Sequence, residues 1–110
     1  MKPEDISKIE AQLEVVLPSL YKQSALAGRF TDPIHDDANA IIAINTAFRA
    51  GEFGDEGWLN NFVAIGHDGG GNYFCLDTDS MNSGVFIRDH ETLELTLAYD
   101  SFGAFISEWA

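Results

Sequence analysis

The sequence is poor in cysteine, and it has no long apolar run. Cys75 is the one cysteine, so the chain cannot form an internal disulfide, and we expect it to be a small core residue in a reducing compartment. No stretch approaches the roughly 18 consecutive apolar residues of a membrane helix. The start of the chain also lacks the apolar segment of a signal peptide. These absences favour a soluble, cytoplasmic protein and no membrane partner.

Basic residues are scarce as well. The chain has 6 Lys and Arg against 18 Asp and Glu, which gives a formal net charge of −12. Nucleic acid is therefore a poor partner, because binding to phosphates needs clustered Lys and Arg. An acidic surface does attract basic proteins and speeds their encounter. The charge leaves two interpretations open, which are solubility alone and a basic protein partner.

Apolar residues are abundant by contrast. They make up 45% of the chain and include 8 Phe, 3 Tyr and 2 Trp. This is enough apolar surface to offset the conformational entropy lost on folding. A chain of 110 residues also has the common size of one domain. We therefore expect a single domain over residues 1–110.

Two helices are predicted at the start of the chain. The first begins near Pro3, and its apolar residues recur at helical spacing. These residues are Ile6, Ile9 and Leu13. Pro18 suits the first position of the second helix, and Gly28 suits a left-handed cap at its end. We expect Val16 and Leu17, between the two helices, to insert into the core.

The middle of the chain is harder to assign. Residues 30–37 are rich in turn formers and are predicted to be irregular. Residues 40–50 fit either a helix or a strand, because "IIAI" is a plausible strand core. Ile41, Ile44 and Phe48 nevertheless fall on one helical face, and the alanines between them favour a helix. We predict a helix.

The second half of the chain predicts a sheet followed by a helix. Four runs are rich in β-branched and aromatic residues and have short connections. They cover residues 62–65, 73–76, 85–87 and 93–97. Asp100 or Ser101 can cap a final helix with apolar residues at helical spacing. These are Phe102, Phe105, Ile106 and Trp109. The fold class is therefore α+β, with a mainly antiparallel sheet of about four or more strands and helices from both ends of the chain packed on it.

Three consecutive glycines, in "HDGGGNYFCLD" at residues 67–77, raise the question of a ligand loop. A phosphate loop precedes a helix and often carries a Lys, whereas a strand follows here and no Lys is present. A tight hairpin does need Asp, Asn and Gly, which tolerate positive φ. We predict a hairpin turn that needs positive φ at Gly70. The next loop, "DTDSMNSG" at residues 77–84, starts like a calcium loop but departs from that pattern at Met81 and Asn82.

Acidic and histidine side chains near strand ends offer the ingredients of a metal or acid–base site. They are His67, Asp68, Asp77, Asp89 and His90. Neighbouring residues of a strand point to opposite faces, so this spacing does not bring them together. A metal-dependent enzyme is the weakest hypothesis, and we expect no catalytic residue, metal or cofactor.

Four stretches of the chain, at residues 6–28, 58–77, 84–94 and 101–109, match a known pattern in their order and spacing. In these stretches the chain resembles the SMI1/KNR4 family, also called the SUKH superfamily. The positions that carry the resemblance are Pro18, Tyr21, Trp58, Gly66, Asp68, Gly70, Gly71, Asn72, Asp77, Asp89 and His90. We expect these positions to be structural. Residues 30–57 show no family pattern.

The resemblance implies an α+β domain with a protein-binding role. Bacterial members are largely immunity proteins that neutralise secreted polymorphic or contact-dependent toxins, many of them nucleases. Fungal members are signalling scaffolds with long extra segments, and the length of this chain favours the bacterial role. The expected partner is a cognate, basic toxin, and the alternative is an intracellular regulatory or scaffold module.

Acidic residues in loops are the predicted partner-binding residues, because loops vary without disturbing a scaffold. They are Asp32, Asp36, Asp37, Glu52, Asp55 and Glu56. We expect that the core does not need them, and that an exposed face of the sheet adds to the same surface.

Overall fold

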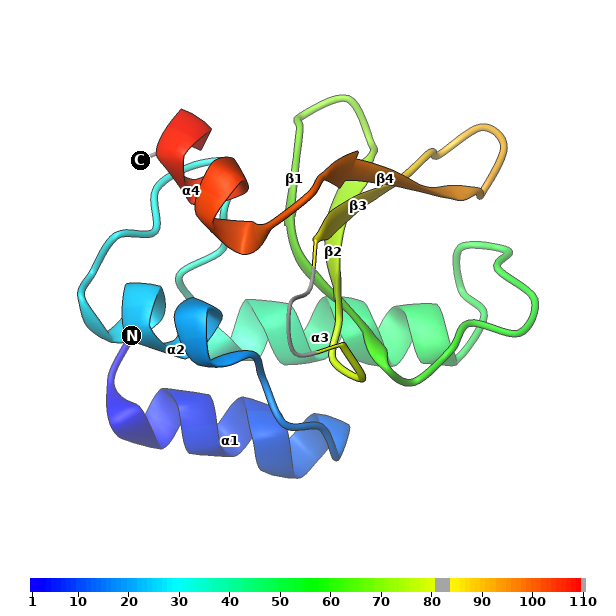
Figure 1. Cartoon of the computed structure of the whole chain (residues 1–110). Coiled ribbons are helices and arrows are strands. Elements are labelled where there is room, and N and C mark those ends of the chain that lie inside the picture. The colour runs from blue at the N-terminus through cyan, green and yellow to red at the C-terminus, as the bar shows by residue number, and fades with distance from the viewer. Residues whose placement is uncertain (81–83, 110) are drawn as a thin grey trace.

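The computed structural model describes residues 1–80 and 84–109, in which helices pack around one antiparallel sheet (Figure 1). The helices are α1 (Pro3–Leu13), α2 (Ser19–Leu26), α3 (Ala38–Arg49) and α4 (Phe102–Trp109). The strands are β1 (Phe62–His67), β2 (Tyr73–Asp77), β3 (Val85–Arg88) and β4 (Leu95–Tyr99). They pair in the order β1-β2-β3-β4. The predicted α+β fold and its antiparallel meander are both confirmed.

Capping residues explain where the helices begin and end. The Asp37 side chain accepts a hydrogen bond of 2.9 Å from the Asn39 N–H, which fixes the start of α3. The Ser101 hydroxyl accepts one of 3.1 Å from the Ala104 N–H at the start of α4. Gly28 has a φ of +71° just after α2, as its predicted capping role requires. The helix predicted within residues 40–50 is confirmed.

The junction between α1 and α2 differs from its prediction. Leu17 is buried as expected, but Val16 is 72% exposed. The Leu17 N–H donates to the Glu10 carboxylate at 2.8 Å, which turns Leu17 inward and its neighbour outward. Pro18 is the residue before α2 rather than its first residue, because its ψ of 143° is extended.

The last strand also starts later than predicted. Leu93 has a φ of +63°, and its N–H donates to the Asp89 carbonyl at 2.8 Å. The chain is therefore still in a tight turn at Leu93, and β4 begins at Leu95. The loop between β2 and β3 includes Met81 and Asn82, which lie outside the described residues.

Both faces of the sheet bury apolar residues. Alternate residues of β1 and β2 face the main core, which includes side chains from every helix. Examples are Ile9, Tyr21, Ile41 and Phe105. On the other face, Ala64 and Cys75 pack with Phe48, and Trp58 stacks on the Phe48 ring at 4.3 Å. The expectation of an exposed sheet face is therefore wrong for β1 and β2, and only β4 is largely exposed.

The outer edge of β1 is closed by a buried side chain. Asn45 of α3 is fully buried, and its amide donates to the Ala64 carbonyl at 2.9 Å and accepts from the Ala64 N–H at 2.7 Å. The amide thus replaces the hydrogen bonds of a neighbouring strand.

The chain before α3 continues this closure along β1. The His35 N–H donates to the Ile65 carbonyl at 2.8 Å, and the His67 N–H donates to the Pro33 carbonyl at 3.2 Å. A Cβ at Gly66 would lie 2.3 Å from the Pro33 carbonyl oxygen, so this close approach requires glycine. Gly66 is therefore structural.

None of the helices within the described residues is long and apolar enough to span a membrane.

We predict that Asn45→Ala destabilises the protein by about 2–4 kcal/mol, because the Ala64 N–H and carbonyl lose their partners in a buried place. Urea unfolding measures this loss. Asn39→Ala is the control on the same helix, since Asn39 is exposed and its side chain accepts from Lys8 at 2.6 Å. It should cost less than about 1 kcal/mol. Equal losses for the two variants would contradict the closure of the β1 edge by Asn45.

Candidate protein-interaction surface

Asp68 organises the loop between β1 and β2. Its Oδ1 accepts from the Gly70 N–H at 2.8 Å and from the Asn72 N–H at 3.2 Å. These bonds, the one to Gly70 foremost, lower the pKa of the Asp68 carboxyl. Asp68 is therefore engaged with its own loop.

The glycine run is a turn as predicted, but the prediction that Gly70 has a positive φ is wrong. Gly69 and Gly71 have φ values of +85° and +99°, and Gly70 has no positive φ. The reason is that Gly70 directs its N–H to Asp68, which an ordinary backbone conformation allows. A Cβ at Gly71 would also lie 3.2 Å from the His90 ring. The conformational requirement for glycine thus lies on either side of Gly70.

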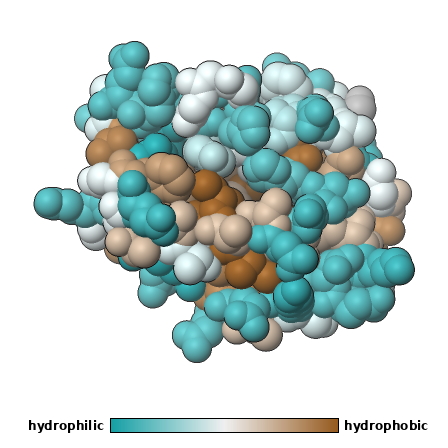
Figure 2. All heavy atoms as spheres, turned by 180° about the vertical axis from the view of Figure 1, so that it is seen from behind, coloured by the Kyte–Doolittle hydropathy of each residue, from teal (hydrophilic) through white to brown (hydrophobic). Residues whose placement is uncertain are grey.

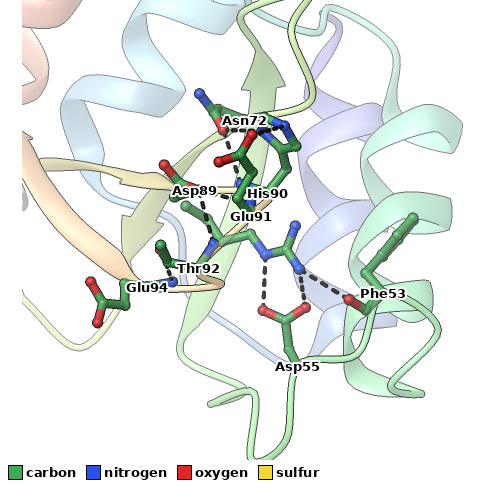
Figure 3. Close-up of polar contacts among 9 residues, drawn as sticks. Phe53, Asp55, Asn72, Asp89, His90, Glu91, Thr92 and Glu94 are labelled. Atoms are coloured by element: carbon green, nitrogen blue, oxygen red, sulfur yellow. Dashed lines mark hydrogen bonds and ion pairs between the residues drawn. The ribbon is translucent and has the colours of Figure 1, made fainter.

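The turn between β3 and β4 is built in a similar way and joins the first loop (Figure 3). Asp89 accepts from the backbone N–H groups of Thr92 at 3.0 Å and Glu91 at 2.7 Å, and these bonds, the one from Thr92 foremost, lower the pKa of its carboxyl. The Asn72 Oδ1 accepts from the His90 N–H at 3.0 Å. Asn72 and His90 therefore hold the two hairpins together.

The residues suggested for an enzyme are spread over separate turns. Asp77, at the end of β2, accepts from the amide of Asn61, just before β1, at 2.8 Å and from the Asp79 N–H, just after β2, at 3.0 Å. Within residues 1–80 and 84–109, no three His, Cys, Asp or Glu side chains are arranged to hold a metal. Cys75 is buried, which raises the pKa of its thiol and disfavours the reactive thiolate.

A buried ion pair attaches the segment after α3 to the sheet. Arg88 of β3 is only 3% exposed, and the Asp55 side chain is 7% exposed. The Arg88 Nε donates to Asp55 Oδ2 at 2.9 Å, and one terminal nitrogen donates to Asp55 Oδ1 and to the Phe53 carbonyl (Figure 3). The guanidinium carbon also lies 4.9 Å from the centre of the Phe48 ring. The expectation that the core does not need Asp55 is therefore wrong.

A small cavity opens where this segment meets the β3–β4 turn, and we call it the Trp58 pocket. Its volume is about 230 Å³. It is lined by Asp55, Glu56, Gly57, Trp58, Leu59, Leu93 and Leu95. Leu59 is 57% exposed, so large apolar side chains and carboxylates share one accessible surface. This combination is typical of surfaces that bind other proteins.

The predicted acidic residues do not form one patch. Asp32, Asp36 and Asp37 precede α3, whereas Glu52 and Glu56 follow it, and all five are exposed. The 12 residues of α3 place the two groups about 18 Å apart. Figure 1 shows the two loops at opposite ends of the helix. Only the second group adjoins the Trp58 pocket.

The group before α3 adjoins a different cavity, of about 400 Å³, which Asp32 lines together with His35, His67 and Trp109. The rings of His35 and His67 lie 5.3 Å apart. Burial lowers the pKa of the His35 imidazole, and the nearby His67 ring lowers it further by electrostatic repulsion. Asp37 also caps α3, so this acidic residue has a structural role at the start of the helix.

Exposed apolar side chains occur elsewhere too. Figure 2 shows some of them near the middle of the face opposite to that of Figure 1, with hydrophilic residues around them. The large apolar residues with the greatest exposure are Val16, Leu20, Leu26, Phe53, Leu59 and Leu97. Phe53 and Leu59 lie in the acidic segment after α3, and Val16 lines another cavity together with Glu14 and Asp79.

The family comparison matches the model of the SMI1 / KNR4 family (SUKH-1) to residues 1–108. The chain belongs to the SMI1/KNR4 family. A search of curated proteins finds no match. In this SMI1/KNR4 chain, Tyr21 is a fully buried core residue whose ring contacts Phe30 and Phe102. Among the positions that carried the resemblance, Trp58 lines the candidate surface.

Sequence reasoning missed three residues of importance here, which are Asn45, Arg88 and Leu93. Asn45 did carry a signal, because it interrupts an otherwise apolar stretch of α3. Arg88 is one of few bases and lies at the end of an apolar run, which points to a buried partner. Leu93 gave no signal, since leucine at positive φ is visible only in the backbone.

We predict that Asp55→Ala destabilises the protein by about 3–5 kcal/mol, because it leaves Arg88 buried without a charge partner. Glu56→Ala is the matched control, since Glu56 is the adjacent acid and is exposed. It should change the free energy of unfolding by no more than about 0.5 kcal/mol. Thermal or urea unfolding of the two variants decides, and similar values for both would show that the ion pair does not anchor the segment.

Proposed function

We propose that this protein is an immunity protein. It binds a cognate secreted toxin, of the polymorphic or contact-dependent kind, in the cytoplasm of the producing bacterium and obstructs the toxin's active site. The observation that carries this proposal is membership of the SMI1/KNR4 family over residues 1–108, since bacterial members of the family are largely immunity proteins. The protein acts by direct contact and not by catalysis.

The charge of the molecule supports a basic partner. The formal net charge is −12, and acidic residues on both sides of α3 are exposed. A nuclease toxin suits this surface, because a protein that binds nucleic acid carries clustered Lys and Arg. Attraction between the two surfaces would speed their association and would favour the cognate partner over acidic proteins.

A survival assay tests the proposal directly. The toxin module encoded beside this gene is expressed in a bacterial host with and without this protein, and the two proteins are then purified together. We expect growth only when both are present, and a stable complex between them. Growth arrest in both cases, with no complex, would contradict the proposal and would favour the alternative of a regulatory or scaffold module.

We predict that salt slows the association of this protein with the toxin. Raising the ionic strength from about 0.05 to about 0.3 M shortens the Debye length from about 14 Å to about 6 Å and screens the acidic surface. The association rate should fall about tenfold or more, whereas the dissociation rate should change little. Stopped-flow or surface-based kinetics measure both rates. An association rate that does not change with salt would contradict this prediction and would mean that the acidic residues serve solubility alone.

A further inference from the structure

We propose that the Trp58 pocket binds one long cationic side chain, a lysine or an arginine, of the protein partner, and that Leu93 determines this recognition. The inference rests on the proposed function because it takes the toxin as the partner. It adds the place of contact and the chemistry of the group that is recognised.

The size and lining of the pocket fit a single side chain. Its volume of about 230 Å³ lies below the range of about 300–1,000 Å³ that is typical of small-molecule sites. Trp58, Leu93 and Leu95 provide apolar surface for the methylene groups of a long side chain. Glu56 provides a carboxylate for its charged end, and an indole ring also attracts cations.

No Lys or Arg side chain lines the Trp58 pocket. Residues 51–59 and 89–95, which line or flank it, contain six carboxylates and no Lys or Arg. The nearest bases in the sequence are Arg49 and Arg88. The Arg88 guanidinium is paired with Asp55, and the Arg49 guanidinium donates to the Asn60 carbonyl at 2.9 Å. Glu52, Glu56, Glu91 and Glu94 are exposed. Asp55 is paired with Arg88, and Glu91 lies 3.7 Å from the His90 ring. A cationic group from a partner would still meet an excess of negative charge at this place.

Leu93 occupies a backbone position that disfavours leucine. The bonds from the Leu93 N–H to the Asp89 carbonyl, at 2.8 Å, and from the Asp89 N–H to the Glu94 carbonyl, at 3.0 Å, define a tight hairpin turn. Its residue at positive φ is normally Gly or Asn. Leu93 nevertheless has a φ of +63°.

Burial does not explain this leucine. Leu93 is partly exposed and belongs to neither hydrophobic core cluster, although its Cδ1 lies over Gly54. Its side chain instead lines the Trp58 pocket. When a residue adopts a backbone conformation that its type disfavours and adds no packing to the core, a role in binding is the expected reason.

The substitution Leu93→Asn separates a binding role from a structural one. Asn tolerates positive φ, so the variant should keep or raise the melting temperature of the protein. Loss of the apolar side chain should weaken binding to the neighbouring toxin about tenfold or more. Val16→Asn is the matched control, because Val16 is also an exposed aliphatic residue but lies outside the pocket, and it should leave binding unchanged. A lower melting temperature with unchanged affinity for Leu93→Asn would overturn the inference.

A second measurement does not depend on the toxin. The protein contains two tryptophans, Trp58 and Trp109, which give two indole N–H signals in a ¹H–¹⁵N NMR spectrum. Titration with N-acetyl-arginine amide should shift the Trp58 signal and leave the Trp109 signal in place. The uncharged citrulline analogue should shift it less, and the Leu93→Asn variant should respond weakly. An equal response to both probes, or a response at Trp109 alone, would overturn the inference.

The two measurements also separate this inference from the proposed function. Unprotected cells together with an arginine-specific shift at Trp58 would contradict the immunity role but support a cation-binding pocket. Protection of the cells together with unchanged affinity of Leu93→Asn would support the immunity role and overturn the assignment of the pocket.

Discussion

The ion pair between Arg88 and Asp55 is the interaction on which the rest of this surface depends. It holds the segment after α3 against the third strand, where the guanidinium also contacts the Phe48 ring. With the segment held there, Trp58 stacks on Phe48 and covers the second face of the sheet. An unpaired buried arginine would be costly, so the segment and the sheet are stable only together. The Trp58 pocket follows from this attachment.

Most of the positions that carried the resemblance have structural tasks, and Trp58 is the one among them that lines the Trp58 pocket. Asp68, Asn72 and Asp89 hold the hairpin turns, and Gly66 allows the close approach of Pro33. These positions keep the scaffold in place. Five exposed acids lie in the loops on either side of α3, which are Asp32, Asp36, Asp37, Glu52 and Glu56. The expectation that residues 30–57 lack the family pattern is wrong, because the family model matches residues 1–108. Exposed loop residues such as these five acids can change without loss of the fold.

Much of the fold could be predicted because it depends on local patterns. Helical spacing located all four of the helices described here, and runs of β-branched and aromatic residues located the strands. The errors have local causes that depend on tertiary contacts. Val16 is exposed because Glu10 binds its neighbour, and Gly70 is not at positive φ because Asp68 binds its N–H. The pairing of Arg88 with Asp55 spans 33 residues, and no periodicity reports such a contact.

Hydrogen exchange of the free and toxin-bound protein tests the central claim most directly, because it reports which backbone segments a partner covers. The account predicts that complex formation slows exchange in residues 52–59 and 90–95, on either side of the Trp58 pocket, and leaves residues 31–37 unchanged. Slower exchange confined to residues 31–37, or to the junction around Val16, would contradict it.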